Sequence, residues 1–138
     1  MSCVLCDRDP EVGEAVFENG SVRVLLHSDS AVRGHALVVS TRHVENVADL
    51  TDEEAWELTR IERAAERALL DATGTDRAIL LKLGIQTPHL HLHIFPVSAS
   101  LDRTAVMRII DGSASEARDE SFASDVRERL QRLTSRDE

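Results

Sequence analysis

Long apolar runs are absent from this 138-residue sequence, and so is any excess of basic residues. No run approaches the roughly 20 apolar residues that a helix needs to cross a bilayer, so we expect no membrane-spanning segment. The N-terminus also lacks a basic stretch followed by an apolar one, and we therefore expect a cytoplasmic protein. The formal net charge of −9 argues against nucleic acids and anionic membranes as general partners, because both are bound through basic surfaces.

Cysteine is also scarce, and the only two residues, Cys3 and Cys6, form a C-x-x-C motif. A structural disulfide is disfavoured in a reducing cytosol. A redox pair of the thioredoxin type asks for a strand before the motif, and nothing strand-like precedes it. Both thiolates of a C-x-x-C can turn toward one ion, so half of a zinc site is the third interpretation. No second C-x-x-C or nearby H-x-x-x-H completes such a site, and the spacing alone leaves the question open.

Histidine, in contrast, is concentrated in residues 86–95, where three of the six histidines recur at a spacing of two. Because side chains of a strand alternate between its faces, His89, His91 and His93 are expected on one face and the aliphatic residues between them on the other. Three imidazoles that titrate near neutrality are rare on a face built only for packing. Either they hold a metal directly, or at least one of them is a neutral nucleophile or general base.

The rest of the pattern predicts one domain of the α+β class with an antiparallel sheet. Strands are expected at residues 15–17, 22–26, 35–40 and 78–81 and in the histidine stretch, with a hairpin at Asn19-Gly20. A helix of about 20 residues is expected from the capping box Thr51-Asp52-Glu53-Glu54 to Gly74. Further helices are expected at residues 103–110 and around 122–133, the second after a loop over 111–120.

The long helix has a stripe of apolar residues that we expect to be buried, which includes Leu58, Ile61 and Ala65. Trp56, the only tryptophan, is expected to pack rather than to serve as a ligand platform. The charged side chains are interpreted as the solvated face of this helix: Glu57, Glu62, Arg63, Glu66 and Arg67.

The stretch His89-Leu90-His91-Leu92-His93-Ile94-Phe95 is similar to the signature of the histidine triad (HIT) superfamily of nucleotide hydrolases and transferases. The similarity extends upstream to Gly34-His35-Ala36-Leu37-Val38-Val39 and Arg42-His43-Val44, and it covers most of the chain from Cys3 to about Val97. This resemblance implies the HIT-like fold, with a five-stranded antiparallel sheet, one long helix and a short C-terminal helix. It also implies a single HIT domain over residues 1–138, with a C-terminal loop and helix at 111–138, and a homodimer.

The resemblance further implies a covalent mechanism at phosphorus. His91 would be the nucleophile that takes a nucleoside monophosphoryl group, and His93 and His35 would line the phosphate. An imidazole is a competent nucleophile near pH 7, because its unperturbed pKa lies near 6.5. Gln86 and Thr87, in the turn before the histidines, are candidate donors to the phosphoryl oxygens, or residues that only satisfy the turn.

A zinc site is also implied by the resemblance. Some bacterial members, and the related galactose-1-phosphate uridylyltransferases, hold zinc with a C-x-x-C, a histidine after the glycine-histidine strand and the first histidine of the triad. The matching residues here are Cys3, Cys6, His43 and His89. The zinc would be structural, and residues 1–13 would form an N-terminal zinc-binding segment.

Two other functions remain open at this point. One is a metal-dependent hydrolase that uses His89, His91 and His93 as ligands. The other is a nucleotide-binding regulatory protein without turnover.

Two residues depart from the family pattern near the expected substrate site. His27 stands eight positions before His35, where many members carry an Asp or Asn that binds the ribose hydroxyls. An imidazole cannot accept two hydrogen bonds as a carboxylate can, so we expect weak ribose recognition. Arg33 replaces the usual proline and is either a fixed charge for a phosphate or carboxylate, or a solvated loop residue.

Overall fold

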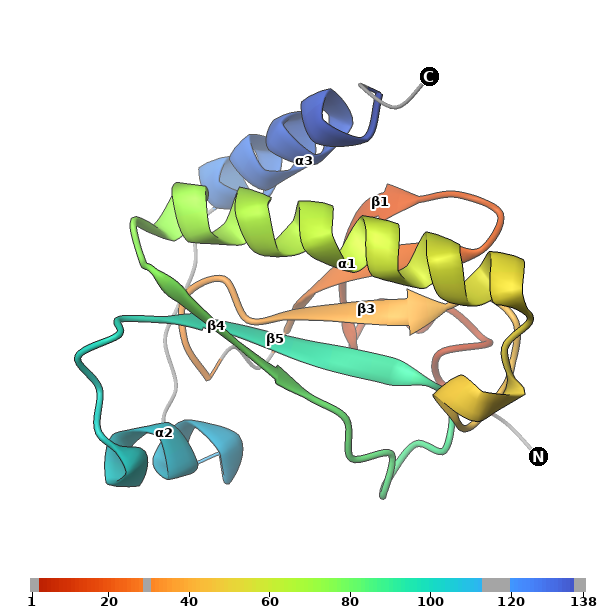
Figure 1. The fold of residues 1–138 in the computed structure, drawn as a ribbon, viewed down its shortest axis with the longest axis horizontal. Coiled ribbons are helices and arrows are strands. Elements are labelled where there is room, and N and C mark those ends of the chain that lie inside the picture. The colour runs from red at the N-terminus through yellow and green to blue at the C-terminus, as the bar shows by residue number, and fades with distance from the viewer. Residues whose placement is uncertain (1–2, 29–30, 113–119, 136–138) are drawn as a thin grey trace.

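The computed structural model describes residues 3–28, 31–112 and 120–135. Its centre is one antiparallel sheet in the order β1-β2-β3-β5-β4 (Figure 1). The strands are β1 (Gly13–Glu18), β2 (Val22–His27), β3 (Ala36–Ser40), β4 (Arg77–Leu81) and β5 (His91–Val97). A 3₁₀ turn, η1 (Val47–Asp49), and the helix α1 (Asp52–Thr73) lie between β3 and β4 in the chain. The predicted α+β class and the five-stranded antiparallel sheet are therefore confirmed.

Local signals in the sequence set the ends of these elements. The side chain of Asn19 accepts hydrogen bonds from the backbone of Ser21 and Val22, which closes the β1–β2 hairpin. Thr51 and Glu54 form the expected capping box at the start of α1. Gly74 ends that helix with φ of 69°, a left-handed conformation that glycine adopts without strain.

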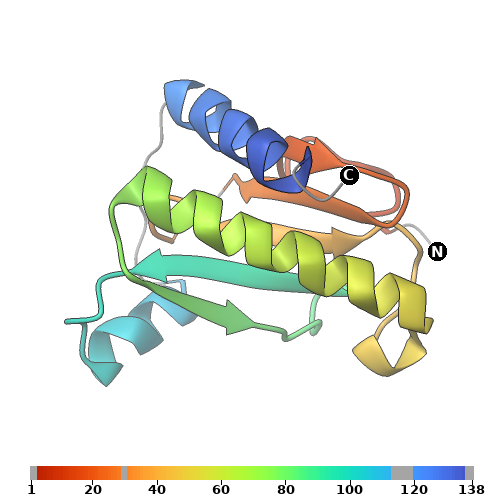
Figure 2. The same cartoon turned by 45° about the horizontal axis from the view of Figure 1, so that its top comes forward.

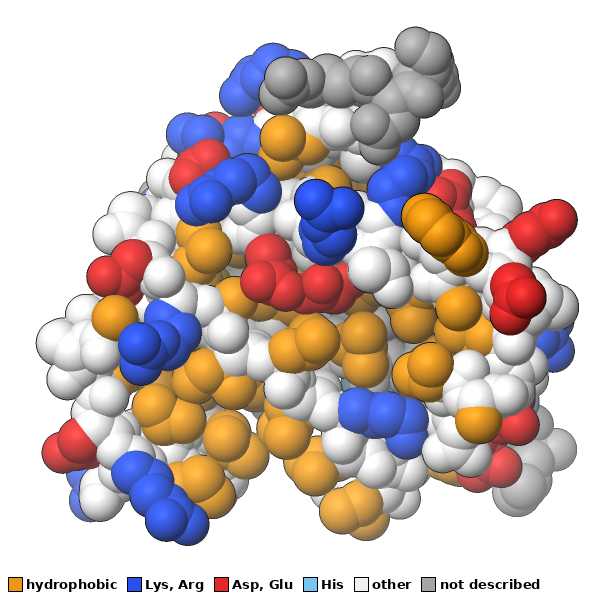
Figure 3. All heavy atoms as spheres, viewed as in Figure 1, with side chains coloured by type: hydrophobic (Ala, Val, Ile, Leu, Met, Phe, Trp, Pro, Cys, Tyr) orange, Lys and Arg blue, Asp and Glu red, His pale blue; other side chains and the backbone are white. Residues whose placement is uncertain are grey.

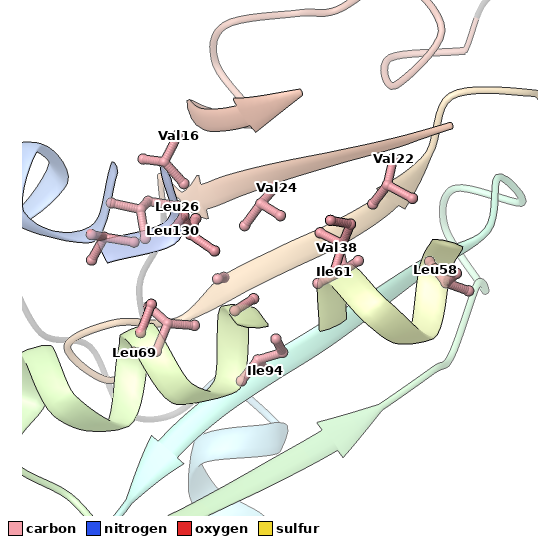
Figure 4. Packing of buried hydrophobic residues seen from close by; sticks show 14 of the residues in the cluster. Val16, Val22, Val24, Leu26, Val38, Leu58, Ile61, Leu69, Ile94 and Leu130 are labelled. Carbon is pink, nitrogen blue, oxygen red and sulfur yellow. The ribbon is translucent and has the colours of Figure 1, made fainter. Parts of the chain in front are cut away.

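The main core lies between α1 and one face of the sheet. Leu58, Ile61 and Leu69 of the helix meet the even-numbered side chains of β2, β3 and β5, which include Val24, Val38 and Ile94 (Figure 4). Leu90 and Leu92 belong to this same cluster. The predicted division of the histidine stretch into an apolar face and an imidazole face is therefore confirmed.

The third helix, α3 (Glu120–Ser135), extends this core. It packs against α1 and β1 on the same side of the sheet (Figure 2), and it buries Phe122, Val126 and Leu130. The predicted C-terminal helix is confirmed, whereas most of the loop predicted before it, residues 113–119, lies outside the described residues. Within the described residues, no helix is both long and apolar enough to cross a membrane.

Within the described residues, two further apolar clusters lie on the opposite face of the sheet, one at each end. At one end, Leu5 of the N-terminal segment packs on Leu25, Leu37 and Val39. At the other end, α2 (Arg103–Ile110) places Ile109 in a cluster with Phe95 and Val97. The imidazoles lie between these two clusters.

Three expectations from the sequence are wrong. β5 begins at His91 and not at His89, where the histidine strand was expected to begin, because the N–H of His89 still belongs to the preceding turn and donates to the carbonyl of Thr87. Trp56 does not pack, because it is 79% exposed on the outer face of α1. Glu62 is not solvated, because only 8% of it is exposed at the border of the buried stripe.

Candidate active site and metal centre

Four histidines in or next to three neighbouring strands meet on the face of the sheet opposite α1. β2 ends at His27 and β3 begins just after His35, and the N–H of His27 donates to the carbonyl of His35 over 2.9 Å. β5 lies beside β3 with Leu37 opposite His93, which brings His93 to the same place. The rings of His27, His35 and His93 lie within 6.1 Å of one another, centroid to centroid, and His91 is 5.2 Å from His93.

Hydrogen bonds assign the tautomers of His35 and His93. The backbone N–H of Ala31 donates to Nδ1 of His35 over 3.3 Å, so the hydrogen of a neutral His35 lies on Nε2. This Nε2–H donates to Nδ1 of His93 over 2.9 Å. The remaining hydrogen of His93 therefore lies on its Nε2, which is left to donate to a ligand.

Burial keeps these two rings uncharged. Desolvation, with smaller contributions from His27 and His93, lowers the pKa of His35 to about 3. Desolvation, followed by His91 and His27, lowers the pKa of His93 to about 4. Both imidazoles are therefore neutral hydrogen-bonding groups at pH 7 and not fixed charges.

In His91 the donor nitrogen is Nδ1, whereas in His35 and His93 it is Nε2. Its Nδ1 lies 2.6 Å from the backbone oxygen of His89. A carbonyl oxygen only accepts hydrogen bonds, so Nδ1 carries a hydrogen, and in the uncharged tautomer the lone pair lies on Nε2. The ring is half-buried. The hydrogen bond at Nδ1 thus orients Nε2, the nitrogen through which an uncharged imidazole can act as a nucleophile.

Two stacked pairs of aromatic rings help to hold the imidazoles in place. The ring of His27 lies flat on that of His35, with centroids 4.4 Å apart and 4° between the planes. Phe95 stacks with His93 at 5.7 Å and 3° and also contacts His35. The sequence analysis did not assign Phe95 to the site, although its position two residues after His93 places it on the same face of the strand.

The remaining candidate substrate residues are Gln86, Thr87 and Arg33. Gln86 is exposed and Thr87 half-buried in the turn before β5, where Thr87 contributes its backbone oxygen to His89. The guanidinium of Arg33 lies 4.6 Å from the ring centroid of Phe122 on α3. The structure therefore groups His27 with the three expected catalytic histidines, and it places Arg33 against α3.

The four residues predicted to hold zinc form one cluster. Cys3, Cys6, His43 and His89 each offer a ligand atom, and these atoms all lie within 4.8 Å of one another. Sγ of Cys6 is 3.1 Å from Nδ1 of His43 and 3.3 Å from Nδ1 of His89, and the two Nδ1 atoms are 3.1 Å apart. Tetrahedral zinc bonds of about 2.0 to 2.3 Å imply separations of roughly 3.3 to 3.8 Å between ligand atoms, so the cluster is close to the size that zinc requires.

The surroundings of His89 also suit a metal ligand. Its Nε2–H donates to the backbone oxygen of Ser40 over 2.6 Å, which leaves the lone pair of Nδ1 directed at the cysteines. Burial lowers the pKa of His89, so the ring is neutral at pH 7, as a ligand must be. Desolvation and the adjacent Cys3 raise the pKa of the Cys6 thiol, and a bound cation would act in the opposite direction. The donor set therefore fits a metal ion.

Comparisons with known proteins agree with this geometry. The family model described as the HIT domain matches residues 11–99. The Protein hit of Bacillus subtilis (strain 168) is 31% identical over 86 residues, which make up 59% of this chain and 59% of that protein. The match thus spans less than two thirds of the length of this relative.

Solved structures show the same fold. A histidine triad protein from Sinorhizobium meliloti 1021 superposes with a TM-score of 0.73 at 20% identity, covering 96% of this chain and 97% of that one. A HIT family member from Bacillus subtilis gives a TM-score of 0.64 at 26% identity, covering 99% of this chain and 94% of that one.

The matched segment carries most of the site. It contains all six histidines, from His27 to His93, whereas Cys3 and Cys6 precede it. It also covers more than half of the chain. The protein therefore belongs to the histidine triad (HIT) family, within a superfamily of nucleotide-binding proteins, hydrolases and transferases.

Proposed function

We propose that this protein is a nucleotide hydrolase or nucleotidyltransferase that acts on the α-phosphate of a nucleoside phosphate conjugate. The observation that carries the proposal is the 2.6 Å hydrogen bond between His91 Nδ1 and the carbonyl of His89, because it leaves Nε2 of His91 with a lone pair. His93, which is neutral and is oriented by the neutral ring of His35, provides an Nε2–H donor without a competing positive charge.

The proposed reaction has two displacements at phosphorus. Nε2 of His91 attacks the α-phosphorus, the bond to the leaving group breaks, and the leaving group takes the electron pair. The Nε2–H of His93 donates to a phosphoryl oxygen as charge builds there. Water or a second acceptor then attacks the phosphorus, the N–P bond breaks, and His91 regains its lone pair.

The metal belongs to this proposal as a structural zinc on Cys3, Cys6, His43 and His89. When bound, it would join the N-terminal segment to His89, two residues before β5, without an open position for substrate. This arrangement favours the nucleophile over a hydrolase whose ion is held by all three triad histidines. Nδ1 of His89 faces the cysteines, whereas Nδ1 of His91 donates to a carbonyl and Nδ1 of His93 accepts from His35.

We include a homodimer in the proposal, together with a single HIT domain over residues 1–138 and a cytoplasmic location. β4 is an edge strand of the sheet. Hydrophobic side chains gather below α1 in the region of β4 (Figure 3), and large aliphatic residues are exposed there and in the following loop, namely Leu80, Leu83 and Ile85. An open edge strand can pair with its own copy across a two-fold axis. Sedimentation at several concentrations would test this.

The decisive experiment traps the intermediate. Zinc-loaded protein is mixed with a nucleoside phosphate conjugate labelled at the α-phosphate, quenched in alkali, and analysed for a labelled peptide containing His91 together with released product. A labelled adduct that forms and decays at the rate of turnover supports the proposal. Chelator-sensitive turnover without an adduct would favour the metal hydrolase, and binding without turnover would favour the regulatory protein.

A further inference from the structure

One residue connects the metal cluster to the reacting imidazole. The side chain of His89 directs Nδ1 at Sγ of Cys3 and Sγ of Cys6, at 3.4 and 3.3 Å. The backbone oxygen of the same residue accepts the hydrogen of His91 Nδ1 at 2.6 Å. A change that moves the backbone at His89 would therefore reach His91 through the carbonyl that accepts the hydrogen of its Nδ1.

The two cysteines differ in how open they are to solvent. Cys6 is exposed and Cys3 is partly buried. A tight turn, closed by the N–H of Asp7 donating to the carbonyl of Cys3, brings the two residues together, and the N–H of Cys6 lies 3.4 Å from Sγ of Cys3. A metal holds both cysteines as thiolates, which is the form that attacks peroxides. Cys6 is thus placed to react with an oxidant first. Cys3 is placed to attack the oxidised Cys6 and form a disulfide with it.

We propose that Cys3 and Cys6 form an oxidation site for small hydroperoxides, and that closing their disulfide expels the metal and slows the reaction at His91. Only the second half of this inference rests on the proposed function. The oxidation site itself depends on the four clustered residues alone.

The chemistry balances with the peroxide as the oxidant. The thiolate of Cys6 attacks one peroxide oxygen, the O–O bond breaks, and Cys6 becomes a sulfenic acid while hydroxide or alkoxide leaves. The thiolate of Cys3 then attacks the sulfenic sulfur, displaces hydroxide and forms the S–S bond. The two sulfurs lose two electrons, the peroxide gains them, and two protons from water complete the products.

The consequences stay local to the site. A disulfide offers no thiolate, so only the imidazoles of His43 and His89 remain, too few for a structural zinc. The ring of His89 is still held through Ser40, and Leu5 is still packed on β2 and β3, so the fold persists. The protein loses the metal–ligand bonds that would hold His89 against the turn containing Cys3 and Cys6.

The test oxidises zinc-loaded, reduced protein with stoichiometric hydrogen peroxide. Zinc release is followed with a chromogenic chelator, disulfide formation by intact mass and thiol titration, and the state of His91 by the rate of nucleotidyl adduct formation. We expect one zinc released per disulfide and an adduct rate at least about 10-fold lower, the size of effect seen when the support of a ligand is lost. Dithiothreitol with added zinc should restore both.

Two variants serve as controls. Met107→Leu removes an exposed methionine that peroxide also oxidises and should behave like the parent protein. Cys3→Ser leaves Cys6 without a resolving thiol and should accumulate a sulfenic acid that dimedone labels.

Several results would overturn the inference. Reduced thiols with retained zinc after the treatment would do so, as would a disulfide that forms without zinc release. Zinc loss with an unchanged adduct rate would remove the link through His89. If the reduced, zinc-loaded protein forms no adduct at all, the proposed function fails instead, and zinc release with disulfide formation still tests the oxidation site.

Discussion

The Nε2–H of His35 donates to Nδ1 of His93 over 2.9 Å, while Nδ1 of His35 accepts the backbone N–H of Ala31. The direction in which His93 presents its own hydrogen is therefore set by the loop between β2 and β3, and not by the triad. His35 is buried and neutral, so we expect it to act in the proposed reaction as a positioning residue through His93.

Replacing His35 tests this relay. His35→Leu has similar bulk but cannot donate to His93, so we expect kcat to fall by about 100-fold with little change in KM. His35→Gln keeps an N–H donor and should recover a substantial part of the loss. Steady-state kinetics of both variants measure the effect, with circular dichroism to verify folding. Equal losses in the two variants would argue that His35 serves only as packing.

His91 and His89 should separate catalysis from metal binding. His91→Ala removes the proposed nucleophile, so we expect turnover to fall by about 10³-fold or more and the adduct to disappear, while one zinc per chain remains. His89→Ala should lose zinc, because its Nδ1 belongs to the ligand set. Metal analysis beside kinetics distinguishes the two. Loss of zinc from His91→Ala would shift the assignment to a catalytic metal.

The proposed zinc site can also be removed by replacing its two cysteine ligands. The double variant Cys3→Ser with Cys6→Ser should bind no zinc and unfold with a free energy lower by about 2 kcal/mol or more, because a ligand that binds only the folded state stabilises it. Elemental analysis and denaturant titration measure the two effects. A double change of the exposed residues Glu11→Gln and Glu45→Gln provides a control that leaves the four ligands in place. Full zinc occupancy in the cysteine variant would contradict the assignment.

The sequence predicted the sheet, the long helix and the imidazole face because those features depend on local periodicity. The alternation of His89 to Ile94 alone divides core from site, whereas joining Cys3 to His89 across 86 positions required the family resemblance. Trp56 could have been placed on the outer face, since its helical neighbours at three and four positions onward, Thr59 and Arg60, are polar. The burial of Glu62 could not have been predicted from the sequence. Glu62 lies at the border of the apolar stripe, where the packing of the helix on the sheet decides how exposed a side chain is.

Glu62 gives the stability a pH dependence of predictable sign. Burial, the hydrogen bond with Glu66 and the charge of Glu66 raise the pKa of Glu62 from 4.5 to about 8, and its Oε1 has no hydrogen-bond partner among the described residues. Below pH 4.5 both folded and unfolded states hold the proton. Between 4.5 and 8 the unfolded state ionises first, so stability falls as pH rises and levels off above about 8.

Glu62→Gln should remove this loss. We expect the variant to gain of the order of 2 kcal/mol over the parent protein at pH 8 and much less at pH 5. Urea unfolding at both pH values measures the difference, with Glu128→Gln on the exposed face of α3 as the control. A gain of equal size at the two pH values would show that the carboxyl of Glu62 does not titrate as proposed.

His27 provides the prediction on substrate choice. Its ring is occupied in a flat stack on His35, and an imidazole offers at most one acceptor to the two ribose hydroxyls. We therefore expect the parent protein to bind ribonucleotide conjugates weakly, with KM raised more than kcat is lowered, and to distinguish little between ribose and 2′,3′-dideoxyribose. Rapid hydrolysis of diadenosine polyphosphates at low KM would show this inference to be wrong.

The reciprocal change should create ribose recognition. The carboxylate of His27→Asp can accept from both hydroxyls, each bond contributing about 1 kcal/mol, so KM for a ribonucleotide conjugate should fall by about 30-fold. KM for the 2′,3′-dideoxy conjugate should not fall, since it offers no hydroxyl to the new carboxylate. A pH profile of the variant accounts for the charge introduced beside His35. Equal improvement for both conjugates would mean that the gain comes from losing the stacked imidazole and not from the ribose.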